Sequence, residues 1–236
     1  MTTLIRALID ASGLSRRKAF AAIREGRVRL DGAVATEPSG PYTVGALALD
    51  GLRLDQRARA HVYLLLNKPP GFVTTRSDER GRATVFDLVP ADLRVIGLHP
   101  VGRLDLNTSG LLILTNDGDL TYRLSHPKHE IEKEYWVGLI RPPTLGQLAA
   151  LRRGVELDGR VLRPLALDLL SGVAGFDVSL SIGEGRKRQV RRMFEAVGAK
   201  VRRLRRVREG PLRLATLPEG AVRELMTTEV TALFGD

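Results

Sequence analysis

The sequence has no cysteine, few aromatic residues and no long apolar run. Without cysteine the chain cannot form disulfides, thiolate metal sites or a cysteine nucleophile, and it fits a reducing cytoplasm. Its apolar runs are only a few residues long, against the roughly 20 residues that span a bilayer. Arg6 and Asp10 interrupt the N-terminal apolar stretch, which excludes a secretory signal. We therefore expect a cytoplasmic protein that does not cross a membrane.

Positive charge is concentrated in one part of the chain. The 236 residues include 37 Lys/Arg and 27 Asp/Glu, a formal net charge of +10. Residues 183–213 alone contain 12 Lys/Arg and three acids. Such a field indicates a polyanionic partner, either a nucleic acid or an acidic membrane surface, although many basic runs are only solvated faces. Charge alone leaves these alternatives open.

The N-terminal part has the pattern of a small domain. Residues 4–30 predict two short helices, the first ending at Gly13 and the second beginning at Ser15 as its N-cap. Short strands follow, the last over residues 44–54, with glycines at the turns between them. These elements predict a compact α+β module of about 50 residues.

A polar connector near residues 55–60 follows this module, so we expect one domain over residues 1–58 and a second over residues 59–236. In the second domain strands and helices interleave, but many connections are short enough for antiparallel pairing. We therefore predict an α+β fold with a mainly antiparallel mixed sheet, and not a doubly wound parallel sheet.

The larger part contains two predicted turns and one pair of histidines that could suggest a metal site. Residues 68–71, Lys-Pro-Pro-Gly, predict a turn between two strands, and residues 116–119 predict a hairpin turn after the buried strand 111–115. The two aspartates of that second turn lack the further spacing of a calcium loop. His126 and His129 have no convincing third ligand, so we expect no metal site.

Three segments of the larger part each offer one unusual side chain: Asp105, Tyr135 and Arg191. Together they suit chemistry on a flipped nucleobase, because a carboxylate can act as nucleophile, a ring can stack on the base and a cation can keep the acid ionised. Spacing alone does not show that they meet. Asp105 by itself fits a turn cap, and Arg188 or Arg192 can replace Arg191 as its partner.

Residues 99–120, 132–137 and 184–198 resemble, in this order, the three motifs of the pseudouridine synthases that modify ribosomal RNA. The branch is the one shared by the small-subunit enzyme and its large-subunit relatives. Residues 4–32 resemble the S4 RNA-binding module that precedes the catalytic domain in that branch. The likeness covers nearly the whole chain and includes residues 67–75 and 211–229.

The resemblance implies a pseudouridine synthase fold and a role for each candidate. Asp105 becomes the catalytic aspartate, Tyr135 stacks on the target uracil with a part in proton removal, and Arg191 becomes the partner of the aspartate. Arg103 inserts near the position that the flipped base vacates. The family reaction breaks the N1 glycosidic bond of uridine and rejoins the ribose to C5, and neither cofactor nor metal is implied. Whether Asp105 attacks C1′ or first assists loss of a C2′ proton stays open.

The expected partner is ribosomal RNA, free or in an assembling subunit, with the protein acting as a monomer. We expect RNA contacts from a basic ridge in the small domain and from the third motif: Arg16, Arg17, Lys18, Arg24, Arg27 and Arg29 in the ridge, and Arg186, Lys187, Arg188, Gln189 and Arg192 in the motif. We also hypothesise that the small domain swings on the connector and helps to dock the RNA.

The sequence leaves the target uridine unknown, with a modest preference for the large subunit. A non-catalytic RNA-binding factor of ribosome assembly is the main alternative, and a DNA-binding regulator is another. The enzyme and the RNA-binding factor both predict salt-sensitive RNA binding, whereas the DNA-binding regulator would bind duplex DNA as tightly as structured RNA. Replacing Asp105 by Asn separates the first two, because only an enzyme loses product formation.

Overall fold

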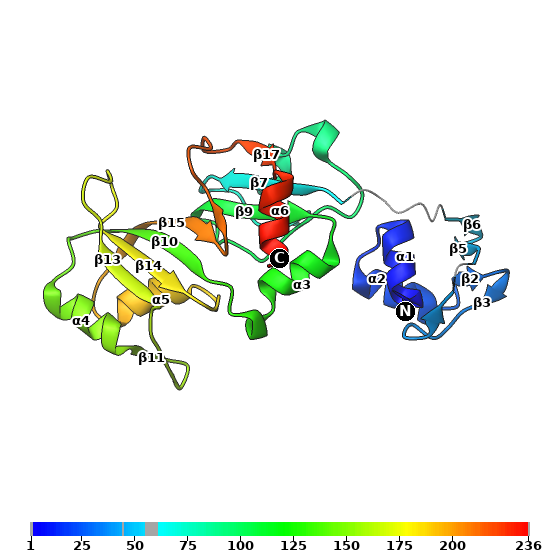
Figure 1. Ribbon diagram of the computed structural model, residues 1–236, viewed down its shortest axis with the longest axis horizontal. Coiled ribbons are helices and arrows are strands. Elements are labelled where there is room, and N and C mark those ends of the chain that lie inside the picture. The colour runs from blue at the N-terminus through cyan, green and yellow to red at the C-terminus, as the bar shows by residue number, and fades with distance from the viewer. Residues whose placement is uncertain (1, 44, 55–60, 236) are drawn as a thin grey trace. The chain divides into compact units, whose positions relative to one another are not determined.

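The computed structural model describes residues 2–43, 45–54 and 61–235 (Figure 1). The chain divides into two compact units. The small unit comprises Met1–His61 with Val95–Gly97, and the large unit comprises Val62–Arg94 with Leu98–Asp236. The connector expected near residues 55–60, and with it the boundary predicted between residues 58 and 59, lies outside the described residues.

The small unit contains two helices and short strands, as predicted. They are α1 (Leu4–Ser12), α2 (Arg16–Arg24), β1 (Thr2–Thr3), β2 (Val28–Leu30), β3 (Ala33–Val34), β4 (Pro41–Tyr42), β5 (Leu47–Leu49) and β6 (Leu52–Arg53). Gly13 adopts the left-handed conformation that ends α1, and the Ser15 hydroxyl accepts from the Lys18 amide at the start of α2. Strands β3, β2, β5 and β6 pair in that order, and β1 pairs with β4.

The helices of the small unit pack through one apolar face each. The buried positions of α1 repeat with helical spacing at Leu4, Leu8 and Ala11, and those of α2 include Ala19 and Ile23. Small alanines let the helices approach closely. The opposite face of α2 is left to solvent with its arginines.

The large unit is built on one nine-stranded mixed sheet, which confirms the predicted α+β class. Its main path runs β13-β14-β10-β15-β9-β7-β17, with β16 paired to β15 and β8 to β9. The strands are β7 (Tyr63–Lys68), β8 (His99–Pro100), β9 (Ser109–Thr115), β10 (Lys133–Leu139), β13 (Ala166–Leu169), β14 (Val178–Ile182), β15 (Val201–Glu209), β16 (Leu212–Arg213) and β17 (Val222–Glu224). Of the strand pairs recorded in this sheet among the described residues, only β9 with β15 is parallel.

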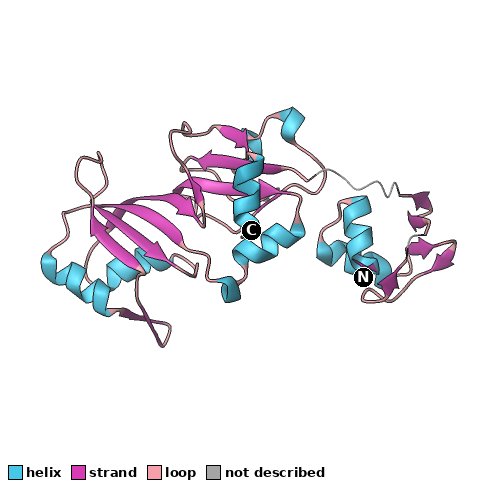
Figure 2. Cartoon of the chain, viewed as in Figure 1, coloured by secondary structure: helices cyan, strands magenta, loops and turns pink. Residues whose placement is uncertain are grey.

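Helices cover the two halves of this sheet, as Figures 1 and 2 show. Helices α3 and α6 lie over the half with β7 and β9, and α4 and α5 lie beside β10 and β14. The helices are α3 (Gly118–Ser125), α4 (Leu145–Arg153), α5 (Gln189–Ala196) and α6 (Thr227–Phe234), and a hairpin of β11 (Val155–Leu157) and β12 (Arg160–Leu162) follows α4. Short 3-10 turns span Val85–Leu88, Ala91–Leu93 and Pro127–His129. In the described part of the chain, no helix has the length and apolarity to cross a membrane.

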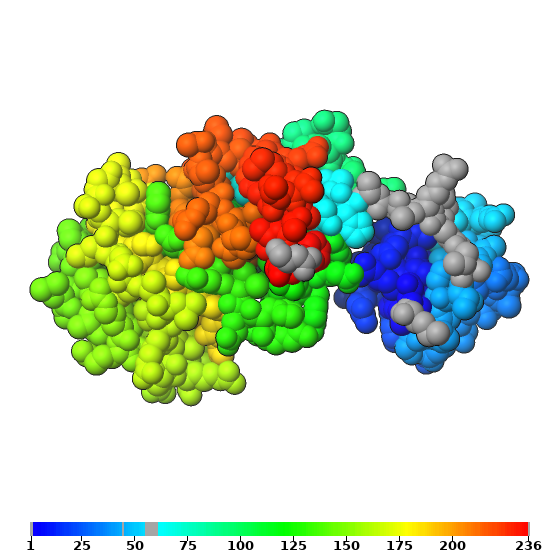
Figure 3. Space-filling model, in the orientation of Figure 1, coloured from blue at the N-terminus to red at the C-terminus, as the bar shows by residue number. Residues whose placement is uncertain are grey.

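A hydrophobic core of the large unit lies between the sheet and helices α3 and α6. Leu111 and Ile113 of β9 and Leu65 of β7 pack there against Leu120 of α3 and Leu233 of α6. The space-filling view shows α6, in red, on the outer face of this half (Figure 3). This packing fixes β9, and with it the loop that carries the candidate aspartate.

Two local predictions were wrong. The segment 116–119 is the start of α3 and not a hairpin turn, because the Asp117 carboxylate accepts from the Asp119 and Leu120 amides and caps the helix. The chain after Lys-Pro-Pro-Gly does not form a second strand. It makes only an isolated bridge between Val73 and Thr84 and otherwise runs as a loop.

The parallel pairing of β9 with β15 joins the strand that follows the Asp105 loop to the strand that follows the third motif. Arg206 of β15 lies opposite Gly110 of β9. A Cβ at Gly110 would lie 2.1 Å from the Arg206 carbonyl oxygen, and the residue has φ +106°. Only glycine allows this close approach. The strand after the Asp105 loop is thereby joined to the strand that follows the third motif.

Candidate active site

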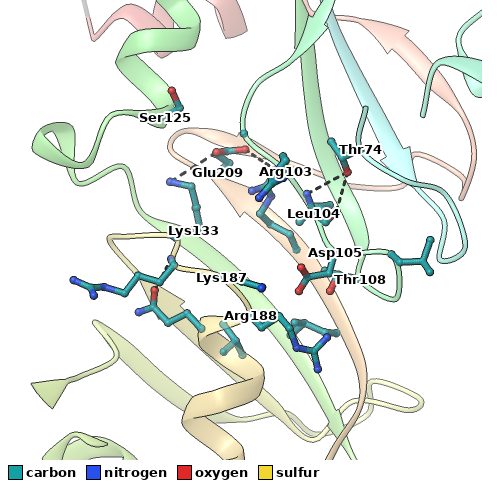
Figure 4. A pocket seen from close by; sticks show the side chains of 18 of the residues that line it. Thr74, Arg103, Leu104, Asp105, Thr108, Ser125, Lys133, Lys187, Arg188 and Glu209 are labelled. Atoms are coloured by element: carbon teal, nitrogen blue, oxygen red, sulfur yellow. Dashed lines mark hydrogen bonds and ion pairs between the residues drawn. The ribbon is translucent and has the colours of Figure 1, made fainter. Parts of the chain in front are cut away.

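A cavity of about 1330 Å³ opens in the large unit and contains the first two predicted catalytic residues, Asp105 and Tyr135. Its wall carries nine Lys/Arg and five Asp/Glu side chains. Figure 4 shows Asp105 and Thr108 on one side of the cavity, across from Lys187 and Arg188. The volume exceeds the about 300–1,000 Å³ of a typical small-molecule site. The cavity is therefore large enough, and basic enough, for more than one nucleotide.

The Asp105 loop is held by its backbone. The Thr108 amide donates to the Asp105 carbonyl at 3.0 Å, and the Thr74 hydroxyl donates to the Leu104 carbonyl at 2.8 Å. Within the residues that the structure describes, the Asp105 carboxylate itself has no hydrogen-bond or ion-pair partner. The loop thus fixes the aspartate and leaves its carboxylate available to a ligand.

Lys68 is a buried cation beneath this loop. Its side chain is fully buried, and its ammonium lies within hydrogen-bond distance of four carbonyl oxygens, at 2.9 Å from Thr108, 3.0 Å from Pro69 and 3.3 Å from Asp105 and Leu106. Burial lowers the pKa of Lys68 to about 8, and the Asp105 charge opposes this shift. The sequence pattern predicted only a turn at Lys68. Its signal was a lysine that ends an apolar strand just before Pro-Pro-Gly.

Arg191 lies behind the Asp105 loop and is 6% exposed. Its guanidinium donates to the Asn107 carbonyl at 2.7 Å and to the Val201 carbonyl at 3.2 Å, so it ties α5 to the loop and to β15. Burial and the charge of Arg188 lower the pKa of Arg191, and the Asp105 charge offsets part of this. No ion pair with Asp105 is found among the described contacts. The pairing of Arg191 with Asp105 stays a prediction, supported by their opposite charges and by the Arg191 contact with the Asp105 loop.

Tyr135 lies in the middle of the sheet, with Arg206 of β15 as its cross-strand neighbour. It is 8% exposed, and its burial raises the pKa of the phenol. The Arg206 guanidinium interacts electrostatically with the phenol, donates to the Leu111 carbonyl at 2.8 Å and pairs with Glu209 at 3.0 Å. Lys133, 3.8 Å from Glu209, completes a buried charged cluster that no sequence motif indicated.

The third motif supplies both wall cations and structural contacts. Lys187 and Arg188 are exposed on the cavity wall, and Arg186 pairs with Glu184 at 3.0 Å. The Gln189 side chain accepts from the Arg186 amide and donates to Glu184, so it shapes the loop. Of the predicted RNA contacts in this motif, Lys187 and Arg188 are therefore the exposed cations, whereas Gln189 supports the loop.

The remaining predicted cations lie in different surroundings. Arg103 is exposed on the cavity wall. Arg192 pairs with Asp158 through two bonds, at 2.6 and 2.8 Å, so of the alternatives to Arg191 only Arg188 lines the cavity.

The basic ridge of the small unit is exposed on α2 at Arg16, Arg17, Lys18 and Arg24. Arg27 instead pairs with Asp50 and Glu25, and Arg29 donates to the Gly32 carbonyl. The first four cations are thus the ones most available to RNA in this unit.

His126 and His129 belong to an aromatic group and not to a recognisable metal cluster. The Tyr122 ring lies 4.8 Å from the His126 ring and 5.7 Å from the His129 ring, and Lys128 lies over the tyrosine. Among the described residues, no group of three His, Cys, Asp or Glu is placed to hold a metal ion.

The chain is similar to known proteins over nearly its whole length. The family model described as RNA pseudouridylate synthase matches residues 62–196, and the S4 domain model matches residues 12–47. A relative from Bacillus subtilis (strain 168), ribosomal large subunit pseudouridine synthase B, is 40% identical and covers 99% of this chain and 96% of its own. An uncharacterized RNA pseudouridine synthase of Mycobacterium tuberculosis (strain ATCC 25618 / H37Rv) is 38% identical over 98% of this chain and 92% of its own.

A solved structure gives the same result for the fold. The crystal structure of a pseudouridylate synthase matches with a TM-score of 0.69 and 34% identity, and covers 99% of this chain and 100% of that one. The family model spans more than half of the chain, and the Bacillus subtilis relative aligns from end to end. The chain therefore belongs to the RNA pseudouridylate synthase family and carries an S4 domain in its N-terminal part.

Proposed function

We propose that this protein isomerises a specific uridine to pseudouridine in the RNA of the large ribosomal subunit. The relative from Bacillus subtilis is named for that subunit and aligns over almost the whole chain. The observation that carries the proposal is the Asp105 carboxylate, without a protein partner among the described residues, in a basic cavity that also holds Tyr135. This arrangement suits an anionic polymer whose target base is turned into the cavity.

The chemistry requires only groups that the chain supplies. The N1–C1′ bond of uridine breaks, the uracil turns, a C5–C1′ bond forms, the C5 proton leaves and N1 gains a proton. The product is an isomer, so no electrons are exchanged with a cofactor. Asp105 acts on the ribose, either as nucleophile at C1′ or as base toward C2′. The Tyr135 ring stacks on the uracil, and its phenol, with Arg206 as its cross-strand neighbour, lies near the base during proton removal.

Two cations keep the Asp105 loop in place during this reaction. Arg191 and Lys68 both donate to carbonyls of the loop, from α5 and from β7. The RNA backbone is bound by exposed cations of the small unit and of the cavity: Arg16, Arg17, Lys18, Arg24, Arg103, Lys187 and Arg188.

Release of tritium from uridine labelled at C5 tests the function. Large-subunit ribosomal RNA transcribed with this label is incubated with the native protein and with Asp105→Asn. We expect release by the native protein and none above background by the variant, with equal RNA binding, because the substitution removes the charge but keeps the shape. Binding by both proteins without release from the RNA of either subunit, free or partly assembled, would favour the non-catalytic RNA-binding protein.

The oligomeric state and location are further parts of the proposal. The protein acts as a monomer in the cytoplasm and without a metal. Light scattering of the native protein with and without RNA tests the first point, and activity after treatment with a chelator tests the last. A dimer in solution, or activity lost to the chelator and restored by a metal ion, would overturn the corresponding part.

A further inference from the structure

The β11–β12 hairpin carries an arginine to the cavity that none of the predicted motifs contains. Its strands pair Val155 with Leu162 and Leu157 with Arg160, and Asp158 and Gly159 form the two-residue turn with φ of 52° and 71°. Left-handed conformations at both positions are those of a tight hairpin turn. The hairpin is therefore a regular, closed element and not a loose loop.

The pairing shows which way Arg160 faces. Side chains of cross-strand partners lie on the same face of a hairpin, and alternate residues along a strand share that face. Val155 and Leu162 are each 7% exposed, so their face is turned toward the body of the unit, and Arg160 lies on the same face nearer the tip. Val161 is 61% exposed on the other face. Arg160 accordingly lines the cavity.

A salt bridge fixes the tip of this hairpin. Both carboxylate oxygens of Asp158 accept from Arg192 of α5, and this interaction lowers the pKa of Asp158. Arg192 directly follows Arg191, which holds the Asp105 loop. One helix thus positions both the candidate aspartate and the hairpin. With Asp158 occupied by Arg192, the Arg160 guanidinium has no hydrogen bond or ion pair in the described part of the chain.

We propose that Arg160 binds a backbone phosphate of the RNA strand next to the target uridine, and that the Arg192–Asp158 pair sets its position. The inference rests on the proposed function, since it concerns the same cavity. The cavity exceeds the size of a site for one small molecule, so flanking nucleotides enter it as well. Arg186 and Lys187 line the same cavity and add to the field that a phosphate meets there.

Kinetics with Arg160→Ala test the contact. An exposed charge contact contributes up to about 1 kcal/mol, so we expect KM to rise about three- to fivefold while kcat stays unchanged. The slope of log affinity against log salt should fall by about 0.7, the value for one phosphate on a single strand. Arg153→Ala is the matched control, because Arg153 is exposed at the end of α4 and does not line the cavity. Equal KM and salt slope for the two variants would overturn the inference.

Neutral phosphates identify the contact. RNA oligonucleotides with one phosphate at a time replaced by an uncharged methylphosphonate are assayed with both proteins. One position should weaken binding to the native protein and leave binding to Arg160→Ala unchanged. If no position distinguishes the two, Arg160 does not bind a phosphate. If the native protein isomerises no uridine in any RNA, the proposed function itself fails, which is a different result.

If the Arg192–Asp158 pair positions Arg160, Asp158→Asn should change KM in the direction opposite to the one that charge alone predicts. Asp158→Asn removes a negative charge, so electrostatics alone would strengthen RNA binding and lower KM. Loss of the salt bridge releases the hairpin tip, and we expect KM to rise instead, with no additional rise in the Arg160→Ala background. A lower KM for Asp158→Asn would show that the pair does not position Arg160.

Discussion

Lys68 determines the shape of the candidate site although it cannot touch a base. Its ammonium interacts with four carbonyls, three of which belong to the loop around Asp105. A buried charge with this many partners is costly to remove, because the carbonyls lose their donor and cannot reach water. The residue links β7 to the candidate aspartate.

Lys68→Met should therefore lower both stability and turnover. The unpaired carbonyls are expected to reduce the free energy of unfolding by about 3 kcal/mol. Urea unfolding followed by circular dichroism measures this, and tritium release measures turnover. Lys187→Met, an exposed cavity cation, should change the free energy of unfolding by less than about 0.5 kcal/mol. An unaltered urea midpoint for Lys68→Met would contradict the role given to Lys68.

Glu209 should act on the reaction only through Arg206 and Tyr135. Glu209→Gln weakens the ion pair that holds the Arg206 guanidinium on the strand opposite Tyr135, and we expect turnover to fall about tenfold. Tyr135→Phe keeps the ring and removes the hydroxyl. In that background Glu209→Gln should have no further effect on kcat. Additive losses in the double variant would instead indicate two independent roles.

At the scale of elements, the contact between β9 and β15 depends on Gly110. Alanine there must move the Arg206 backbone, since its Cβ would lie 2.1 Å from the carbonyl oxygen. We expect Gly110→Ala to lower the free energy of unfolding by more than about 2 kcal/mol and to impair turnover. Gly198→Ala is the control, because it also has positive φ but no atom within 4 Å. Equal destabilisation by both variants would show that backbone strain, and not the close approach, matters.

Helix α6 is attached to the sheet by an acid-sensitive ion pair. Arg223 of β17 donates twice to Glu229 at 2.6 Å, and these bonds lower the pKa of Glu229. A lowered pKa in the folded state means that the stabilisation is complete above the unfolded pKa and is lost as pH falls through the folded value. Glu229→Gln should therefore cost about 1 kcal/mol at pH 7.

The cost of Glu229→Gln should disappear in acid. Urea unfolding of both proteins from pH 7 to below the usual pKa of a glutamate measures the difference. A difference that stays constant over this range would assign the effect to packing and not to the carboxylate charge.

Elements with a strong local signal could be predicted from the sequence, and those set by tertiary contacts could not. The ends of α1 and α2 followed from Gly13 and Ser15, which act on their own neighbours. The start of α3 was mistaken for a hairpin, because Asn-Asp-Gly-Asp fits both a turn and an Asp117 N-cap. What decides is the packing of Leu120 and Leu124 against the sheet, which local sequence does not contain.

The same division holds for the candidate site. Asp105 and Tyr135 were found from motifs, and they do line one cavity. Lys68, Arg206 and Glu209 were missed, because a lysine, an arginine and a glutamate are ordinarily exposed and nothing local marks them as buried. Their burial arises from strands that are distant in sequence, since Arg206 reaches the Leu111 carbonyl of β9.

At the scale of the whole molecule, positive charge is divided between the two units. The cations of α2 are exposed, and a second set lines the cavity of the large unit. Two separate basic surfaces on one chain let a structured RNA be held at more than one place, which raises the effective concentration of the target at the cavity.

Replacement of Arg16, Arg17 and Lys18 by alanine should weaken docking without altering chemistry. We expect KM to rise, kcat to stay unchanged and the slope of log affinity against log salt to fall by about two, for three phosphate contacts. Filter binding and tritium release over a range of salt measure these quantities. A fall in kcat with unchanged KM would mean that the small unit acts on the reaction itself and not on docking.

The parallel pairing of β9 with β15 also bears on when the protein becomes active during its synthesis. The Arg206 side chain and its acceptor on Leu111 are 95 residues apart, so the contact forms only after β15 has left the ribosome. A growing chain that ends before β15 already contains Asp105 and Tyr135, but it lacks the strand that pairs with β9 and places Arg206 opposite Tyr135. We therefore expect no RNA modification until most of the chain has been translated.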